Sequence, residues 1–103
     1  MAAQVVVLYN TPADADAFAR HYAEIHTPLA KKMPGLRSFS VSHGPVATPQ
    51  GPAPYHLVAT LTFDSMAELQ AGFGSAEGRA TAADLGNFAQ AGVTILMFES
   101  RDA

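Results

Sequence analysis

Two side chains that could do chemistry lie one helical turn apart in the segment Phe18 to Phe39. Tyr22 and His26 are separated by four residues, which places both on the apolar side of a helix. An imidazole titrates near neutral pH, so a histidine at the edge of a cavity can act as a general acid or base. A tyrosine hydroxyl beside it can hold a substrate oxygen. We therefore take His26 as the candidate catalytic residue and Tyr22 as a candidate substrate-binding residue.

Pro28 bears on this hypothesis because it interrupts the predicted helix just after His26. Proline has no N–H to donate to the carbonyl of Glu24, and its ring crowds that turn, so we expect the helix to kink or loosen there. A kink would open a wedge between helix and sheet with His26 at its mouth. The alternative is a half-buried histidine that hydrogen-bonds a freed backbone carbonyl, and the residues alone do not decide between the two.

The other three histidines lie elsewhere in the predicted fold. His21 precedes His26 by five residues, about 140 degrees around an α-helix, so we expect it on the surface and outside any site that contains His26. His43 and His56 lie at the ends of two predicted strands that flank a proline-rich loop, which can bring both to the same end of the sheet. We keep both as candidate substrate-binding residues, with polar side chains at solvated strand ends as the alternative for each.

The elements that position these residues alternate between strand and helix. Apolar β-branched runs and helical spacing predict strands at residues 5–9, 36–44, 55–63 and 92–98, and helices at residues 12–32 and 65–88. We expect one α+β domain over residues 1–103, with the ferredoxin-like order βαββαβ, a four-stranded antiparallel sheet and helices on one face.

Capping residues and apolar spacing define these helices further. Thr11 is the predicted N-cap of the first helix, followed by Pro12 in its first turn. Ser65 and Ser75 are the predicted caps of the two parts of the second helical region. The predicted apolar face of the first helix consists of Phe18, Tyr22, Ile25 and Leu29.

Composition narrows the function classes. The chain has 103 residues, of which 49% are hydrophobic and 15% charged, as in a globular domain. Its net charge is −3 with only six lysine and arginine residues, so we expect no nucleic-acid partner. The N-terminal residues lack the features of a signal peptide and no apolar run approaches the length of a membrane span, so we expect a cytoplasmic protein without a membrane partner.

The spacing of potential ligands argues against a bound metal or cofactor. There is no cysteine, and no pair of histidines has the spacing H-x-H or H-x-x-x-H that is typical of metal sites. No glycine-rich motif for a nucleotide or flavin occurs either. We therefore expect no cofactor and no metal.

The stretches FARHYAEIHTPLAKKMPGLRSFSV and FGSAEGRATAADLGNFA resemble the EthD family of the dimeric α+β barrel superfamily. The resemblance covers nearly the whole chain, and its most specific part consists of Phe18, Tyr22, His26, Pro28 and Leu29 followed by Pro34, Gly35 and Leu36. It implies a ferredoxin-like protomer, a homodimer and a small-molecule pocket between sheet and helices. Relatives in the superfamily include cofactor-free monooxygenases, lactone isomerases and polyketide cyclases. The family motif favours the functional interpretation of His26.

Three functions are compatible with these observations. The first is an enzyme that moves a proton on a small hydrophobic or aromatic carbonyl compound, as an isomerase, cyclase or decarboxylase with His26 as acid or base. The second is an oxidoreductase, a cofactor-independent monooxygenase in which the same base forms a carbanion that reacts with oxygen. The third is a non-catalytic ligand-binding accessory protein.

The apolar strands predict a homodimer that packs through its sheet. Residues 5–9 and 95–98 are apolar at consecutive positions, and two helices can cover only one face of the sheet. We expect sedimentation at micromolar concentration to give the mass of two chains. A monomeric mass would contradict this prediction.

Overall fold

The structure, a computed structural model, describes residues 1–103 and has the predicted α+β class and ferredoxin-like order. The strands of its main sheet are β1 (Ala2–Tyr9), β2 (Leu36–Val41), β5 (Leu57–Phe63) and β6 (Val93–Ser100). Their order in the sheet is β2-β5-β1-β6, and every neighbouring pair is antiparallel. The helical segments are α1 (Ala15–His21), η1 (Tyr22–His26), α2 (Thr27–Lys31), α3 (Met66–Gly74) and α4 (Ala76–Phe88).

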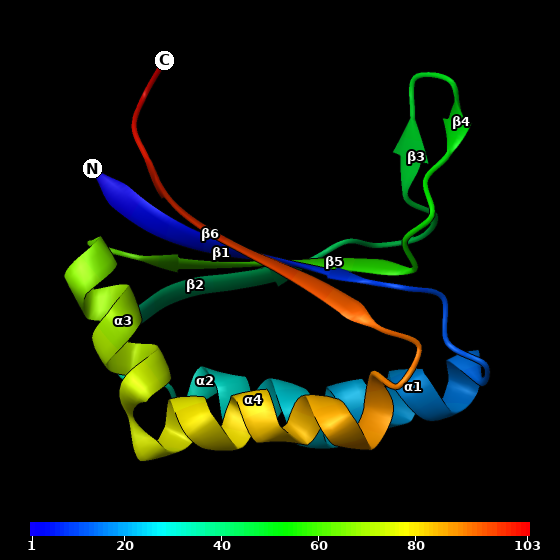
Figure 1. The fold of residues 1–103 in the computed structure, drawn as a ribbon, viewed down its shortest axis with the longest axis horizontal. Helices are drawn as coiled ribbons and strands as arrows, with labels where there is room; N and C mark the ends of the chain where they lie inside the picture. Colours follow the sequence, from blue (N-terminus) through cyan, green and yellow to red (C-terminus); the bar gives the residue numbers. More distant parts are fainter.

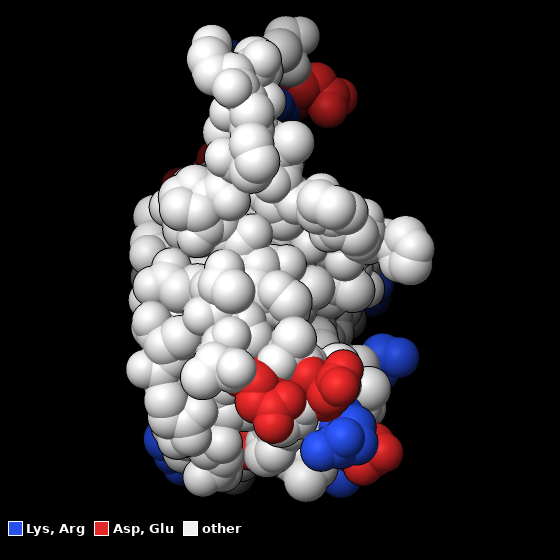
Figure 2. Space-filling view, turned by 90° about the vertical axis from the view of Figure 1, so that its right-hand side faces the viewer, with Lys and Arg blue, Asp and Glu red and all other residues white.

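All helices lie on one face of the sheet, and none lies over the other face (Figure 1). The odd-numbered residues of β1 from Ala3 to Tyr9 are buried against the helices, whereas the even-numbered residues between them are partly exposed. At the edge of the sheet, the apolar residues Ile95 to Phe98 of β6 are each 39–49% exposed. On the side drawn in Figure 2, charged side chains gather at the helical end of the molecule, the middle of the face is nearly free of them, and a few more appear at the opposite end.

The strand boundaries differ from the predicted ones at the ends that carry histidines. β2 ends at Val41, so His43 lies beyond it, and β5 begins one residue after His56. Between them, the predicted proline-rich loop contains a two-stranded hairpin of β3 (Ala47–Thr48) and β4 (Gly51–Pro52). Figure 1 shows this hairpin projecting on the side of the sheet opposite to the helices.

The first helix begins three residues later than predicted, so the expected Thr11 cap was wrong. Asp14 has extended backbone geometry and its carboxylate accepts a hydrogen bond of 3.0 Å from the N–H of Ala17. Both Thr11 and Asp14 are good N-cap residues, and the helix starts after the later one. The predicted caps Ser65 and Ser75 are confirmed, because each hydroxyl accepts a backbone N–H three residues on, at 3.1 and 3.0 Å.

The loosening predicted at Pro28 takes the form of a π-helical turn. The N–H of Thr27 donates to the carbonyl of Tyr22, five residues earlier, so the helix is wider over η1 than an α-helix. Pro28 then lies in the first turn of α2, where its missing N–H costs little.

This π-turn changes which side chains face the sheet. The predicted apolar face was wrong at Ile25, which is 46% exposed. His26 is buried in its place, with Tyr22 one turn before it and Ala30 one turn after it. The pairing of residues five apart puts one more residue into this turn than an α-helix holds, and in the wider turn His26 faces inward.

Close packing between α3 and α4 determines where α4 lies. A Cβ added at Gly78 would overlap the carbonyl oxygen of Gly72 and the backbone of Phe73. Because Gly78 has no Cβ, the start of α4 can lie directly against the end of α3, and α4 then runs beside α1 and α2 in the helical layer.

We expect Gly78→Ala to lower the free energy of unfolding by about 1–3 kcal/mol, because one of the two backbones must move. The matched control is Gly86→Ala in the same helix, where an added Cβ would meet no atom. The control should leave stability unchanged or raise it by up to about 1 kcal/mol, since alanine favours helix. Urea unfolding of the two variants measures the difference, and similar effects of both substitutions would contradict the packing argument.

Candidate functional site

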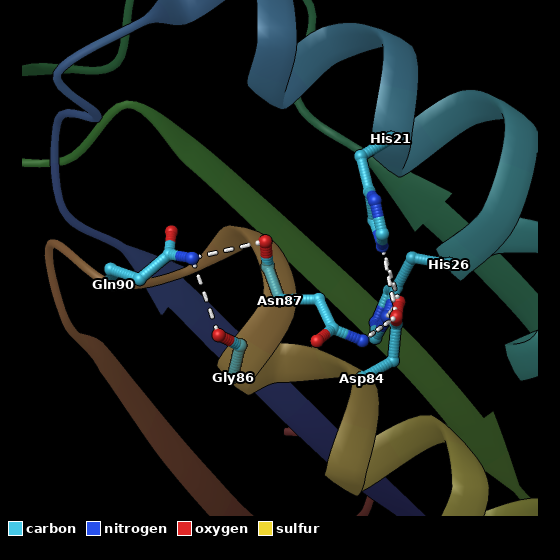
Figure 3. Close-up of polar contacts among 6 residues, drawn as sticks. All are labelled: His21, His26, Asp84, Gly86, Asn87 and Gln90. Carbon is cyan, nitrogen blue, oxygen red and sulfur yellow. Dashed lines mark hydrogen bonds and ion pairs between the residues drawn. The ribbon is translucent and has the colours of Figure 1, made fainter.

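One buried carboxylate joins α4 to the helical segment formed by α1, η1 and α2. Asp84 accepts hydrogen bonds from His21 Nε2 at 2.8 and 3.0 Å through its two oxygens, and from His26 Nδ1 at 3.0 Å (Figure 3). Asn87 Nδ2 donates to the same carboxylate at 3.0 Å. Asp84 and His26 are each only 5% exposed. His21, His26 and Asp84 form the centre of the candidate site.

The expectation that His21 lies on the surface, apart from His26, was wrong. That expectation assumed an α-helix, in which positions five apart point in different directions. The π-turn places such positions nearly above one another, so both rings reach Asp84. His21 remains more open than its partner, with 23% of its side chain exposed against 6% for His26.

The hydrogen bonds around Asp84 keep it ionised. Burial alone would raise the pKa of its carboxyl group, but the hydrogen bonds from Asn87, His21 and His26 outweigh this effect, and the pKa lies below its ordinary value. An ionised carboxylate only accepts hydrogen bonds, so the facing nitrogen of each imidazole carries a proton. Nδ1 of His26 is therefore the protonated nitrogen, and Nε2 on the other side of the ring has a free lone pair.

His26 is held in its neutral form by burial. Burial lowers the pKa of its imidazole, although the hydrogen bond and the negative charge of Asp84 act in the opposite direction. A positive charge on His21 also lowers the pKa of His26. The ring can therefore accept a proton at neutral pH, which is the state that a general base requires.

His26 lines an apolar cavity between the sheet and the helices. The cavity has a volume of about 40 Å³, and its walls come from all four strands of the main sheet and from the helical layer. Besides His26, the lining residues with polar side-chain atoms are Tyr9, Tyr22 and Thr81, and no lysine or arginine lines the space. A cavity of this size holds a water molecule or two, so a larger ligand requires its walls to move.

Two tyrosines in this cavity are buried and have strongly shifted pKa values. Burial raises the pKa of Tyr22 to about 12, and burial together with the neighbouring Tyr22 raises that of Tyr9 well above its ordinary value. The rings meet edge to face with centroids 5.6 Å apart. Their hydroxyls are close enough to affect each other's titration, but the hydroxyl of Tyr22 is in no hydrogen-bond geometry with any partner.

The other two predicted substrate-binding residues lie outside this cavity. His43 is exposed, and His56 is half-buried with its ring edge against Phe18 at a centroid distance of 5.2 Å. The structure therefore brings together Tyr22 and His26, while the roles of His43 and His56 stay predictions.

Sequence reasoning missed Asp84 and Tyr9. Asp84 lies on the buried face of α4 with Thr81 and Phe88, at spacings of three and four residues. An acidic residue at such a position in an otherwise apolar pattern was the available signal. Tyr9 was assigned only to the first strand, at whose end it faces the helices.

The structure contains no group of three or more histidine, aspartate or glutamate side chains arranged to hold a metal ion. None of its helices has the length and apolarity that crossing a membrane would require.

Comparison with known proteins gives close matches over most of the chain. The sequence profile of the EthD domain matches residues 10–92. An uncharacterised 11.0 kDa protein in the thcB–thcC intergenic region of Rhodococcus erythropolis is 41% identical over 93 residues, which cover 90% of this chain and 89% of that protein. The crystal structure of an EthD family protein from Bacillus halodurans C-125 is 33% identical, with a TM-score of 0.88 over 98% of this chain and all of the other.

More distant structures share the fold. Hydroxynitrile lyase from Passiflora edulis has a TM-score of 0.77 at 13% identity, and the cofactor-independent oxygenase SnoaB from Streptomyces nogalater has 0.70 at 11%. Each match covers 99% of this chain and 95% of the other. A dimeric ferredoxin-like protein of unknown function from Thermobifida fusca has 0.70 at 12% identity, over 95% of this chain and 90% of that chain.

We expect the free energy of unfolding to fall as the pH is lowered through about 6.5, the ordinary pKa of histidine. The unfolded chain takes up a proton there, whereas His26 in the folded protein has a lower pKa and stays neutral. A second loss is expected below about 3.8, where the unfolded form of Asp84 becomes protonated before the folded one.

Urea unfolding between pH 3 and pH 8 measures both effects. His26→Gln should flatten the upper part of the profile and leave the lower part, while His43→Gln, at an exposed position, should leave both. Identical profiles for the wild type and His26→Gln between pH 5 and pH 7 would contradict the assigned state of His26.

Proposed function

We propose a function from the premise that this chain belongs to the EthD family. The protein binds a small hydrophobic or aromatic carbonyl compound in the cavity between sheet and helices. It then moves a proton on this compound without a cofactor. His26 is the acid–base group. The observation that carries this proposal is the hydrogen bond of 3.0 Å between His26 Nδ1 and Asp84, at a position where the same ring lines an apolar cavity.

Asp84 supports His26 as a base in two ways. Its hydrogen bond to Nδ1 fixes the orientation of the ring and leaves Nε2 available for the ligand. When Nε2 takes a proton, the positive charge forms directly beside the carboxylate, which stabilises the imidazolium. Asp84 is therefore a positioning residue, and His26 is the catalytic residue.

The apolar cavity suits a carbonyl compound that loses a proton from the carbon next to the carbonyl group. Such a proton is weakly acidic, and a neutral imidazole close to it can remove it once the substrate is held in place. Returning the proton to another carbon of an unsaturated compound gives isomerisation, and attack by the carbanion on a second carbonyl gives cyclisation. In a decarboxylation, loss of carbon dioxide itself forms the carbanion, and protonated His26 returns a proton to it.

A cofactor-independent monooxygenase is the alternative with a specific motivation, the shared fold with SnoaB. In that reaction the carbanion formed by His26 would react with oxygen, so consumption of oxygen separates it from proton transfer alone. A non-catalytic ligand-binding protein is the third possibility. It predicts that a ligand is recovered unchanged after incubation.

The uncovered apolar strands support a homodimer packed through the sheet, as the sequence analysis expects. The exposed residues Ile95 to Phe98 and the alternate residues of β1 provide the apolar surface. The Thermobifida fusca protein of the same fold is described as dimeric. A second copy of this chain is the proposed partner.

The experiment that tests the proposed function measures exchange of hydrogen for deuterium next to the carbonyl of small ketones, with cyclopentanone as the first probe. We expect the protein in D₂O to accelerate this exchange, and His26→Gln to reduce the acceleration by ~10²-fold or more, as is usual for a proton-transfer group. NMR of the ketone follows the reaction.

His43→Gln is the matched control, since His43 is exposed and lies outside the cavity. Asp84→Asn should give a smaller but clear loss, because the ring of His26 would no longer be held beside an ionised carboxylate. Equal exchange rates with the wild type and His26→Gln, when both are folded, would contradict the proposal. Native mass spectrometry of freshly purified protein would identify a retained ligand for the same assay.

A further inference from the structure

The hydroxyl of Tyr22 is a buried polar group without a partner. Tyr22 is 7% exposed and lines the cavity, yet its oxygen meets no partner in good hydrogen-bond geometry, and the hydroxyl of Tyr9 is the one side-chain group near enough to affect its titration. Native proteins rarely leave such a group unpaired, because the group loses its hydrogen bonds to water on folding and gains nothing in return. A buried tyrosine hydroxyl with only a second tyrosine beside it, at the wall of a cavity that contains a candidate base, points to a ligand atom that the two hydroxyls would bind.

Tyr9 provides a second hydroxyl at the same place. Its ring packs against Tyr22 with centroids 5.6 Å apart, and both residues line the cavity together with His26. The ring of His26 is adjacent to Tyr22, with centroids 5.4 Å apart. Two tyrosine hydroxyls and one base therefore belong to the wall of a space whose one other polar lining residue, Thr81, donates its hydroxyl to the carbonyl of Glu77.

We propose that the hydroxyls of Tyr9 and Tyr22 form a binding site for the oxygen of the ligand, and that the ligand is therefore a neutral ketone, aldehyde or lactone rather than a carboxylate. This inference rests on the proposed function for the role of His26 and extends it by naming the groups that bind the oxygen. Both hydroxyls are donors, because burial keeps the tyrosines protonated.

The charge distribution around the cavity supports a neutral ligand. No lysine or arginine lines the cavity, so a carboxylate would lose its hydration without gaining a cationic partner. The negative charge of Asp84 also reaches the hydroxyl of Tyr9, whose pKa it raises. An anion would be repelled there, whereas a carbonyl oxygen needs only hydrogen-bond donors.

The same arrangement accounts for each atom in the proposed proton transfer. His26 Nε2 takes the proton from the carbon next to the carbonyl, and the electron pair of that C–H bond forms a C=C bond. The π electrons of the carbonyl move to its oxygen, and the tyrosine hydroxyls hydrogen-bond the enolate oxygen so formed. In a ligand with a further C=C bond next to that carbon, return of the proton from Nε2 to the far end of this bond completes an isomerisation without another reactant.

A carbonyl ligand larger than a few atoms requires the cavity to widen beyond its volume of about 40 Å³. Met33 and Phe73 both line it, and methionine has three rotatable bonds with low barriers. Rotation of these side chains enlarges the cavity without moving Tyr22 or His26.

Three probes of similar shape test the oxygen site: cyclopentanone, methylenecyclopentane and cyclopentanecarboxylate. The first two differ only in the atom doubly bonded to the ring. We expect the wild type to bind the ketone more tightly than the hydrocarbon, and Tyr22→Phe or Tyr9→Phe to reduce this preference by about tenfold, the loss of one hydrogen bond. Ligand-detected NMR measures the affinities.

Tyr22→Phe should also stabilise the protein in the absence of ligand, because it removes an unpaired buried hydroxyl. We expect its thermal midpoint to rise by about 4 °C or more. Tyr55→Phe is the control, since Tyr55 is the one tyrosine that does not line the cavity. This substitution should change neither the preference for the ketone nor the thermal midpoint.

The oxygen site is overturned if the wild type does not prefer the ketone, if the carboxylate binds as tightly, or if both tyrosine variants keep the wild-type preference. A lower thermal midpoint for Tyr22→Phe would also overturn it. These binding measurements need no turnover, so they test the oxygen site separately from the proposed function. The proposed function is contradicted by a different result, hydrogen exchange that does not depend on His26. If the preference for the ketone depends on Tyr22 but the protein does not accelerate hydrogen exchange, the oxygen site stands and the protein binds a ligand without catalysis.

Discussion

The candidate site depends on one backbone hydrogen bond in the helical segment formed by α1, η1 and α2. This bond joins the N–H of Thr27 to the carbonyl of Tyr22, five residues earlier. Pro28 has no N–H for the carbonyl of Glu24, and the turn before it widens into a π-helix. The wider turn buries His26 where an α-helix would bury Ile25, and it aligns His21 with it. Without this change of pairing, Asp84 on the opposite helix would meet an apolar side chain.

Burial and charge are balanced differently at Asp84 and Tyr22, two neighbours of His26. Asp84 stays ionised at 5% exposure because three side chains donate to it, so its charge is compensated within the protein. Tyr22 lies about as deep and has no such compensation. The molecule therefore satisfies the group that positions His26 and leaves unsatisfied the group that would meet a ligand. This contrast is typical of a binding site, where stability is lost in favour of function.

The fold could be predicted from the sequence because its signals are local. Apolar runs, the serine caps at positions 65 and 75, and the break after Met33 define strands and helices within a few residues of their observed ends. The site could be predicted only in part, since Tyr22 and His26 are neighbours on one helix. Asp84 is 58 residues away from His26, so no local spacing relates them. The error at His21 came from assuming 3.6 residues per turn in the one segment that departs from this value.

The hydrogen bonds at Asp84 join residues 58 and 63 positions apart, one group from each half of the chain. Neither half can form the histidine–aspartate pairing alone, so the pairing arises only after α4 has docked beside α1 and α2. A transient detachment of α4, while the sheet stays intact, would expose the carboxylate and both imidazoles to water at once. The integrity of the candidate site therefore follows the local opening equilibrium of α4 rather than the global unfolding of the sheet. Amide hydrogen exchange in α4 would be the most sensitive measure of how often the site exists in its assembled form.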